Sequence, residues 1–222
     1  MESDIAKKIA IELGVSEVAV VREEWELLIL NEISKHPLGD ALIFKGGTAL
    51  RLAYGLPRFS QDLDFDLVGK SASFKAFENL CRGIESKFSI LLEDIADKHF
   101  TWLAEFKISE GFLIHPFRIK LEISKRKNSQ KNLSEIVLLK SQVTSLEVVF
   151  SVMTLKQIFQ EKTLALKTRR LPKDLFDLWY VSRRLDEAID LSSFKLQKKD
   201  LDKDLKSLLP KNYWKVLEEL SL

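Results

Sequence analysis

The stretch FKGGTALRLAYGLPRFSQDLDFDL, residues 44–67, has two glycines near its start and three aspartates at alternate positions near its end. In an extended strand, Asp62, Asp64 and Asp66 project from one face, and the apolar residues between them project from the other. Successive carboxylates are then about 7 Å apart, and each neighbouring pair repels by roughly 2–3 kcal/mol at an effective dielectric near 20. Either a hydrated sheet edge or a bound divalent cation compensates for this repulsion.

The spacing of these acids differs from that of an EF-hand calcium loop. A loop that begins at Asp62 needs glycine at its sixth position and glutamate at its twelfth, where the sequence has Leu67 and Ser73. Carboxylates beside an open polar side suit Mg²⁺, which is held partly by carboxylates and partly by substrate phosphates. The stretch therefore favours magnesium over calcium.

The glycines follow a short apolar run, residues 41–44, and precede a helix-like segment. Thr48 is a good helix N-cap, so we expect a strand, a glycine turn and a helix that begins at Thr48. Backbone N–H groups and the positive end of a helix dipole at such a turn attract an anion such as phosphate. No GxxxxGK[ST] motif occurs, which excludes a Walker-type ATPase. A double glycine alone more often marks a tight turn, but next to an acidic strand it indicates a phosphate site.

The flanking sequence predicts an α+β protein. Helical periodicity covers residues 18–33, 73–88 and 154–170, and Pro172 is placed to begin another helix. The strand-like segments are residues 62–68, 88–93, 99–108, 112–124, 135–140 and 146–152. We expect a core with N-terminal helices and a mixed sheet in residues 1–150. A helical C-terminal domain, residues 151–222, then completes the active site.

Two charged residues stand out in these elements. Glu122 shares a strand face with Lys120. On a strand beside the aspartates Glu122 would complete a carboxylate cluster, and otherwise it is an exposed residue paired with Lys120. Lys162 falls inside the apolar face of helix 154–170, where its side chain either extends to solvent or reaches a phosphate as a point charge.

Two acids follow Pro172. Asp174 lies in the first turn of the expected helix, where an acid is favourable for structural reasons alone. Asp177 lies one turn further along the same face. It could orient Lys162, accept a hydrogen bond from a nucleotide, or pair with Arg169 or Arg170. We regard Asp177 as the functional one of the two acids.

Composition bounds the class of protein. The chain has 222 residues, 45% of them hydrophobic and 31% charged, which suffices for a sizeable core. Cys81 is the only cysteine, so neither an intramolecular disulfide nor a cysteine-based zinc site forms, and the three histidines are too scattered for a zinc site. No leader and no apolar run of ~18 residues occurs. We therefore expect a cytoplasmic protein without a membrane partner.

Charge is divided unevenly between the halves of the chain. Residues 1–110 hold 13 Lys and Arg against 19 Asp and Glu, a net charge of −6, and residues 111–222 hold 22 against 14, a net charge of +8. This asymmetry suggests a metal site that faces a surface for a polyanion, although ordinary surface charge explains it equally well.

Three motifs occur in the order KGGTALR, RFSQDLDF and EKTLAL…RR…KDLFDL. Together they resemble the AbiEii/AbiGii nucleotidyltransferase toxins of the DNA polymerase β-type superfamily, over residues 44–179. The resemblance implies a nucleotidyltransferase-type mixed sheet flanked by helices. It also implies a toxin of a toxin–antitoxin or phage-defence system, with a cognate antitoxin encoded nearby. Such a toxin transfers a nucleotide from an NTP to RNA, in some members to the 3′ end of tRNA.

The resemblance also implies roles for particular residues. Mg²⁺ or Mn²⁺ would be held by Asp62 and Asp64, with Glu122 as a third ligand chosen by position. The nucleotide-binding set is Lys45, Gly46, Gly47, Thr48, Ser60, Lys162 and Asp174. The catalytic set is Asp62, Asp64, Glu122, Lys162 and Asp177. Lys173 stands where the family usually has arginine, which removes a bidentate donor from that position.

Basic residues near these motifs are candidates for an RNA-backbone surface, which contributes affinity without sequence choice. They are Lys125, Arg126, Lys127, Lys131, Lys167, Arg169, Arg170 and Lys173. Two alternative functions remain open. One is transfer of the nucleotide to a protein or to a small molecule such as an aminoglycoside. The other is an inactive nucleotide-binding module that sequesters a partner.

Overall fold

The computed structural model describes residues 1–68, 72–126 and 134–222 of the chain. Its helices are α1 (Ser3–Leu13), α2 (Glu17–Lys35), α3 (Gly46–Tyr54), α4 (Phe74–Phe88), α5 (Leu155–Arg169), α6 (Pro172–Leu185), α7 (Lys198–Leu205) and α8 (Trp214–Glu219). Its strands are β1 (Leu42–Lys45), β2 (Asp62–Leu67), β3 (Leu91–Lys98), β4 (Thr101–Ile108), β5 (Phe117–Ser124), β6 (Ser134–Leu139) and β7 (Val148–Met153). Short 3₁₀ turns at 39–41, 192–194, 206–208 and 211–213 complete the assignment.

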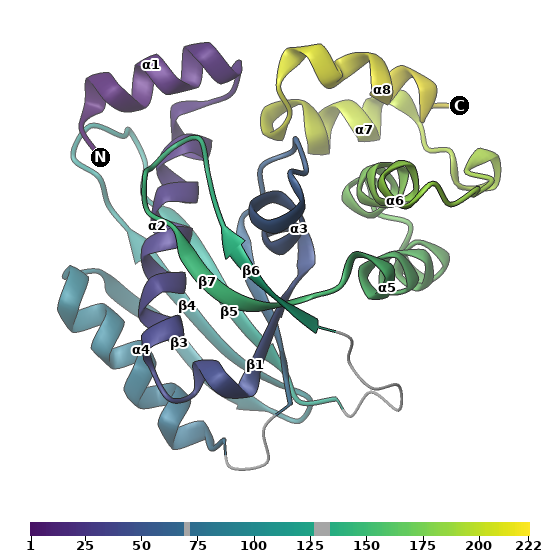
Figure 1. Cartoon of the computed structure of the whole chain (residues 1–222). Coiled ribbons are helices and arrows are strands. Elements are labelled where there is room, and N and C mark those ends of the chain that lie inside the picture. Colours follow the sequence, from purple (N-terminus) through teal and green to yellow (C-terminus); the bar gives the residue numbers. More distant parts are fainter. Residues whose placement is uncertain (69–71, 127–133) are drawn as a thin grey trace.

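The strands form one mixed sheet in the order β3-β4-β5-β2-β1-β7-β6 (Figure 1). β2 runs parallel to β5 and antiparallel to β1, and β1 runs parallel to β7. The α+β fold with a mixed sheet flanked by helices, expected from the sequence, is therefore confirmed. The acidic strand lies in the middle of the sheet, so its compensation cannot come from a hydrated edge.

The two faces of the sheet pack against different helices. Phe44 of β1 and Phe65 of β2 point to the face covered by α2 and α4, in a core that also holds Phe77 and Trp102. Ile43 points to the other face, where it packs with residues of α5, α6, α7 and α8. Since Ile43 pairs directly with Asp66, the aspartates share the face that the C-terminal helices cover. In Figure 1, α5 and α6 accordingly lie on the opposite side of β1 from α4.

Most element boundaries follow the predicted periodicities. Ser73 caps α4 through a bond to the backbone N–H of Ala76, and Pro172 is the first residue of α6. The predicted strand 112–124 is shorter, because β5 begins only after Pro116, which has no N–H to donate. The sheet continues to Met153, and the helical region begins at Leu155.

The prediction that Thr48 caps helix α3 was wrong. The helix begins two residues earlier, at Gly46, with Lys45 as its N-cap. Gly46 has φ +80°, a conformation that only glycine adopts readily, and this residue turns the chain from strand to helix. Thr48 is fully buried, and its Oγ1 donates to the carbonyl oxygen of Asp62 at 2.6 Å. The threonine therefore fastens the helix to the start of β2.

Candidate active site

The glycine turn closes directly against the acidic strand. A Cβ on Gly46 would overlap Oδ2 of Asp64, so the residue must be glycine for steric as well as conformational reasons. A Cβ on Gly47 would lie 2.8 Å from Oγ of Ser60 and 2.5 Å from Nη2 of Arg58. The glycine turn and residues 58–64 thus meet at the N-terminus of α3. The first backbone N–H groups of a helix have no partner within the helix, so they are available to an anion.

Parallel pairing with β5 brings Glu122 beside the aspartates. Asp64 pairs with Glu122, and Asp62 pairs with Lys120. The predicted neighbouring strand is therefore present. In the described part of the chain, however, no three His, Cys, Asp or Glu side chains are grouped so as to hold a metal ion. Lys120 Nζ lies 2.6 Å from a carboxylate oxygen of Glu122, and Glu122 as a third metal ligand remains a prediction.

The surroundings of Asp64 disfavour the ionised form of its carboxyl group. Burial raises its pKa to about 6, with further contributions from the negative charges of Asp62 and Glu122, while Lys162 and Lys45 offset part of the shift. Burial also raises the pKa of Asp62. Two carboxylates that resist ionisation beside each other fit a divalent cation, because its charge stabilises both in the ionised form. The residues present therefore suit the magnesium or manganese expected from the sequence.

Lys45 faces acids rather than open space. Its Nζ lies 2.7 Å from Asp66 Oδ1 and 3.5 Å from Glu161 Oε2 on α5. Asp66 is 4% exposed. The third aspartate therefore anchors the end of β1 to the C-terminal helices through Lys45, and a direct contact between Lys45 and a nucleotide remains a prediction.

A buried charge cluster joins α5, α6 and the segment before β2. Lys162 Nζ lies 3.0 Å from Asp174 Oδ1 and 2.7 Å from Asp177 Oδ2. Arg58 donates from Nε and Nη2, one edge of its guanidinium, to the two carboxylate oxygens of Asp177, at 2.6 and 2.7 Å. Arg169 does the same to Asp174, at 2.6 and 2.9 Å. Lys162 is thus held in ion pairs, and the alternative that it extends to solvent is wrong.

Arg58 is the residue that the sequence reasoning missed. The expected partners of Asp177 included Arg169 and Arg170, but Arg169 binds Asp174, whereas Arg58, 119 residues earlier, binds Asp177. Asp177 is fully buried. Burial by itself would raise its pKa, but Arg58 and Lys162 more than offset this and hold the pKa below its ordinary value. The signal available in the sequence was an arginine two residues before Ser60, inside the motif already singled out.

The candidate RNA-binding residues that the structure describes fall into two groups that lie at opposite ends of β2. The first group, in and between α5 and α6, is Lys167, Arg169, Arg170 and Lys173, and the second group, directly after β5, is Lys125 and Arg126. Lys173 donates to Gln61 at 2.9 Å, beside Asp62. Lys125 follows Ser124, which pairs with Asp66. Lys127 and Lys131 lie outside the described residues.

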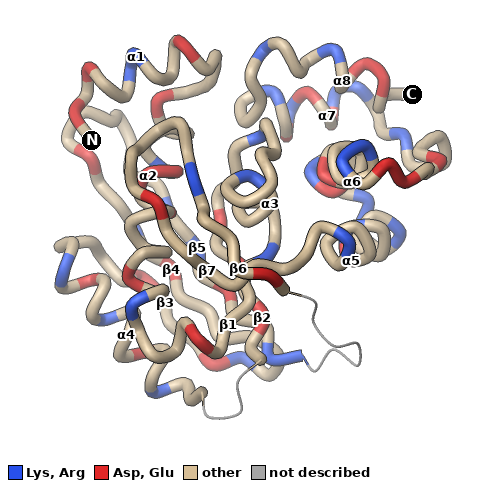
Figure 2. Tube along the Cα trace, viewed as in Figure 1, with Lys and Arg blue, Asp and Glu red and all other residues tan. Residues whose placement is uncertain are grey.

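The first group is the more accessible one. Lys167 and Arg170 are exposed, and neither forms an ion pair within the described part of the chain. Figure 2 shows this basic group along α5 and at the start of α6. In the second group, Lys125 is paired with Asp97, and Arg126 stacks over Phe100 with its Cζ 5.3 Å from the ring centroid.

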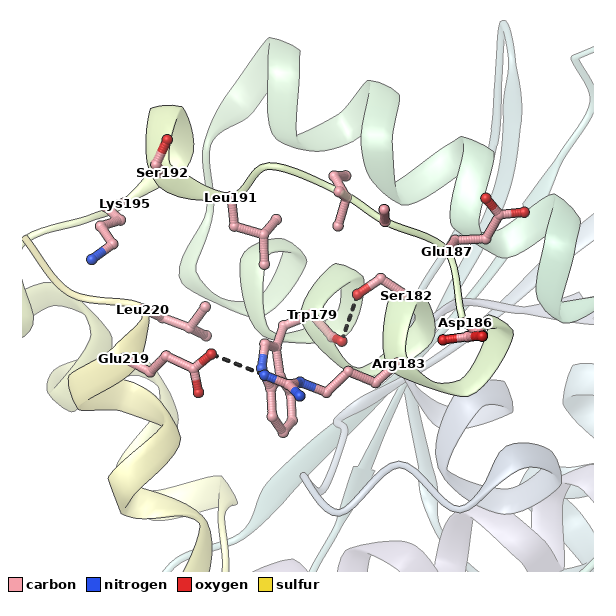
Figure 3. Close-up of a pocket in the computed structure, with 12 residues that line it drawn as sticks. Trp179, Ser182, Arg183, Asp186, Glu187, Leu191, Ser192, Lys195, Glu219 and Leu220 are labelled. Carbon is pink, nitrogen blue, oxygen red and sulfur yellow. Dashed lines mark hydrogen bonds and ion pairs between the residues drawn. The ribbon is translucent and has the colours of Figure 1, made fainter.

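A cavity of about 520 Å³ lies behind α6 and is not part of this site (Figure 3). Trp179 lines it, and Arg183 stacks over the indole at 5.1 Å from the ring centroid while pairing with Glu219 at 2.9 Å. Trp179 follows Asp177 by two residues, which places it on the opposite face of the helix. The cavity therefore opens away from the acidic strand.

The comparisons with known proteins agree with this geometry. The profile of a family described as nucleotidyl transferase AbiEii toxin, Type IV TA system, matches residues 28–218. No curated protein matches the chain. The crystal structure of JHP933 from Helicobacter pylori is similar with a TM-score of 0.63 and 26% identity, over 93% of this chain and 88% of that one.

A second crystal structure from H. pylori, of a candidate nucleotidyltransferase, is similar with a TM-score of 0.60 and 24% identity, over 94% of this chain and 100% of that one. The family match covers most of the chain and includes the glycine turn, the acidic strand and the buried charge cluster. The chain therefore belongs to the AbiEii nucleotidyltransferase toxin family of Type IV toxin–antitoxin systems.

Proposed function

We propose that the protein transfers a nucleotide from an NTP to a hydroxyl group of RNA, with Mg²⁺ or Mn²⁺ held by Asp62 and Asp64. The observation that carries this proposal is the contact between the glycine turn and the acidic strand, where Gly46 lies against Asp64. This contact brings the N-terminus of α3 next to the carboxylate of Asp64, which supports the binding of a metal-bound triphosphate there. The cation would neutralise phosphate charge and polarise the transferred phosphoryl group.

Lys162 contributes further positive charge to the proposed triphosphate site. An ammonium group has three N–H donors, and Asp174 and Asp177 accept two of them. One donor remains for a phosphate oxygen. The two aspartates, each also held by an arginine, restrict the rotamers of Lys162 so that its charge is already in place when the nucleotide arrives.

The acceptor enters over the C-terminal helices in this proposal. Lys167 and Arg170 offer exposed positive charge, and Lys173 links this surface to Gln61 beside the metal-binding aspartates. By contrast, the open face of β3, β4 and β5 carries paired charges, such as Arg118 with Glu93 at 2.6 Å. A polyanion is attracted to the first surface and gains little from the second.

Within the described residues, no helix is long and apolar enough to cross a membrane. We place the activity in the cytoplasm, where NTPs and RNA are both present. The toxin–antitoxin family implies a cognate antitoxin that counteracts the toxin.

The test is a labelling experiment with each radiolabelled NTP in turn, Mg²⁺ and total bacterial RNA. Label should enter a discrete RNA band with the wild-type protein and with Asp40→Asn, an exposed control. It should be absent with Asp62→Asn/Asp64→Asn. Label in protein or in a small molecule would refute the RNA acceptor and support transfer of the nucleotide to that other class of acceptor. Bound NTP without any transfer would favour an inactive nucleotide-binding module.

A further inference from the structure

Arg51 lies in the last turn of α3, at the end of the helix away from the glycine turn, and its side chain is 11% exposed. Its Nη1 donates to the carbonyl oxygens of Leu56 at 3.2 Å and Pro57 at 2.9 Å. Its Nε and Nη2 both bind the carboxylate of Glu23 on α2, the latter at 3.1 Å. One guanidinium therefore ties the backbone of the segment after α3 to a helix of the core.

The partners of Arg51 are themselves held in place. Glu23 is 2% exposed and accepts a third hydrogen bond, from Ser141 Oγ at 2.5 Å. The guanidinium also lies over the ring of Phe59, with its Cζ 3.5 Å from the centroid. Both edges and one face of the planar group are in use, an arrangement that a lysine ammonium cannot reproduce.

The segment that Arg51 holds, residues 56–60, leads back to the candidate active site. The N–H of Phe59 donates to the carbonyl oxygen of Leu208 at 2.7 Å. Between these anchors, Arg58 reaches Asp177, and Ser60 lies against Gly47. The position of residues 56–60 thus determines where Arg58 stands, and through Asp177 it determines where Lys162 stands.

We propose that Arg51 is a positioning residue for nucleotide binding: by fixing residues 56–60 it holds Arg58, and thereby Lys162, in the geometry that binds the triphosphate. The proposal rests on the proposed function in that it needs an NTP site at Lys162. Among the described residues, no hydrogen bond or ion pair joins Arg51 to the acidic strand. It borders a cavity of about 730 Å³ that is also lined by Glu23, Phe59 and Tyr213, so water can occupy the space that a smaller side chain vacates.

The test compares Arg51→Lys with Tyr180→Phe. Tyr180 Oη donates to the carbonyl oxygen of Tyr54 at 2.6 Å, so its removal also loosens the end of α3 but leaves residues 56–60 held. Hydrogen exchange at the Phe59 amide reports on the segment, and direct binding of an NTP with Mg²⁺ reports on the site. Arg51→Lys should speed that exchange and weaken NTP binding, each by roughly tenfold or more, because hydrogen bonds of a charged donor are lost. Tyr180→Phe should do neither.

A double variant separates positioning from general destabilisation. If Arg51 acts through Lys162, Arg51→Lys should weaken NTP binding little further in a Lys162→Met background. Additive losses, unchanged exchange at Phe59, or faster exchange with unchanged NTP affinity would each overturn the proposal. These readouts do not depend on transfer to RNA, so failure of RNA labelling by the wild-type protein would refute the proposed acceptor and leave the test of Arg51 intact.

Discussion

Replacement of Asp64 by asparagine should stabilise the protein at neutral pH while it removes a proposed metal ligand. The side chain is nearly isosteric and loses only its charge. In the folded protein that charge is unfavourable, because Asp64 is largely enclosed between Gly46 and β5 with Asp62 and Glu122 nearby. Sites that bind ligands commonly reduce stability in this way.

The expected gain follows from the pKa. The pKa rises from 3.8 to about 6 on folding, and at roughly 1.4 kcal/mol per unit this amounts to about 3 kcal/mol at pH 7 before allowance for partial solvent exposure. We therefore expect a gain of about 2–3 kcal/mol. Between pH 4 and pH 6 the folded state binds this proton more tightly than the unfolded state does. The stability of the wild type consequently falls as pH rises through that window, and the advantage of the variant is present above pH 6 and lost near pH 4.

Urea unfolding at pH 4 and pH 7, with and without Mg²⁺, measures these differences. Asp40→Asn is the matched control and should change the free energy of unfolding by less than about 0.5 kcal/mol at both pH values. Mg²⁺ should raise the stability of the wild type at pH 7 and leave Asp64→Asn nearly unchanged. An equal effect of Asp64→Asn at both pH values, or a loss of stability at pH 7, would refute the reasoning.

Three further substitutions test the packing around the site. Gly46→Ala should reduce the free energy of unfolding by more than about 1 kcal/mol, because Gly46 has a φ of +80° and the new Cβ would overlap Asp64. Gly83→Ala on α4, where the added Cβ meets open space, should raise the free energy of unfolding by up to about 1 kcal/mol. Thermal unfolding compares the two variants. Arg58→Met leaves Asp177 buried with one partner fewer and should cost about 3–5 kcal/mol in urea unfolding, whereas Arg183→Met at an exposed pair should cost less than about 1 kcal/mol. Thr48→Val should cost about 1–2 kcal/mol by the same assay, through the lost bond to the Asp62 carbonyl, and no change would exclude that bond as a significant contribution.

The amino-acid sequence by itself determined most of the local structure of this protein. Alternation in DLDFDL predicts β2, and the double glycine predicts a strand-to-helix turn, because both depend on near neighbours in the chain. The same holds for α4, α5 and α6, whose periodicity and capping residues are local. The motifs that resemble the AbiEii toxins also lie within such segments, which is why the family was recognisable without coordinates.

The tertiary structure decided how these segments are joined. Local patterns placed Lys162 inside an apolar face and left Asp177 with several candidate partners, but only the packing of α5 and α6 on the sheet brought Arg58 to Asp177. It likewise showed that Arg51 holds residues 56–60. These contacts join residues far apart in the chain, or depend on the path of a loop, and periodicity carries no information about either. A buried charge in the sequence indicates that a partner exists, and only the fold identifies that partner.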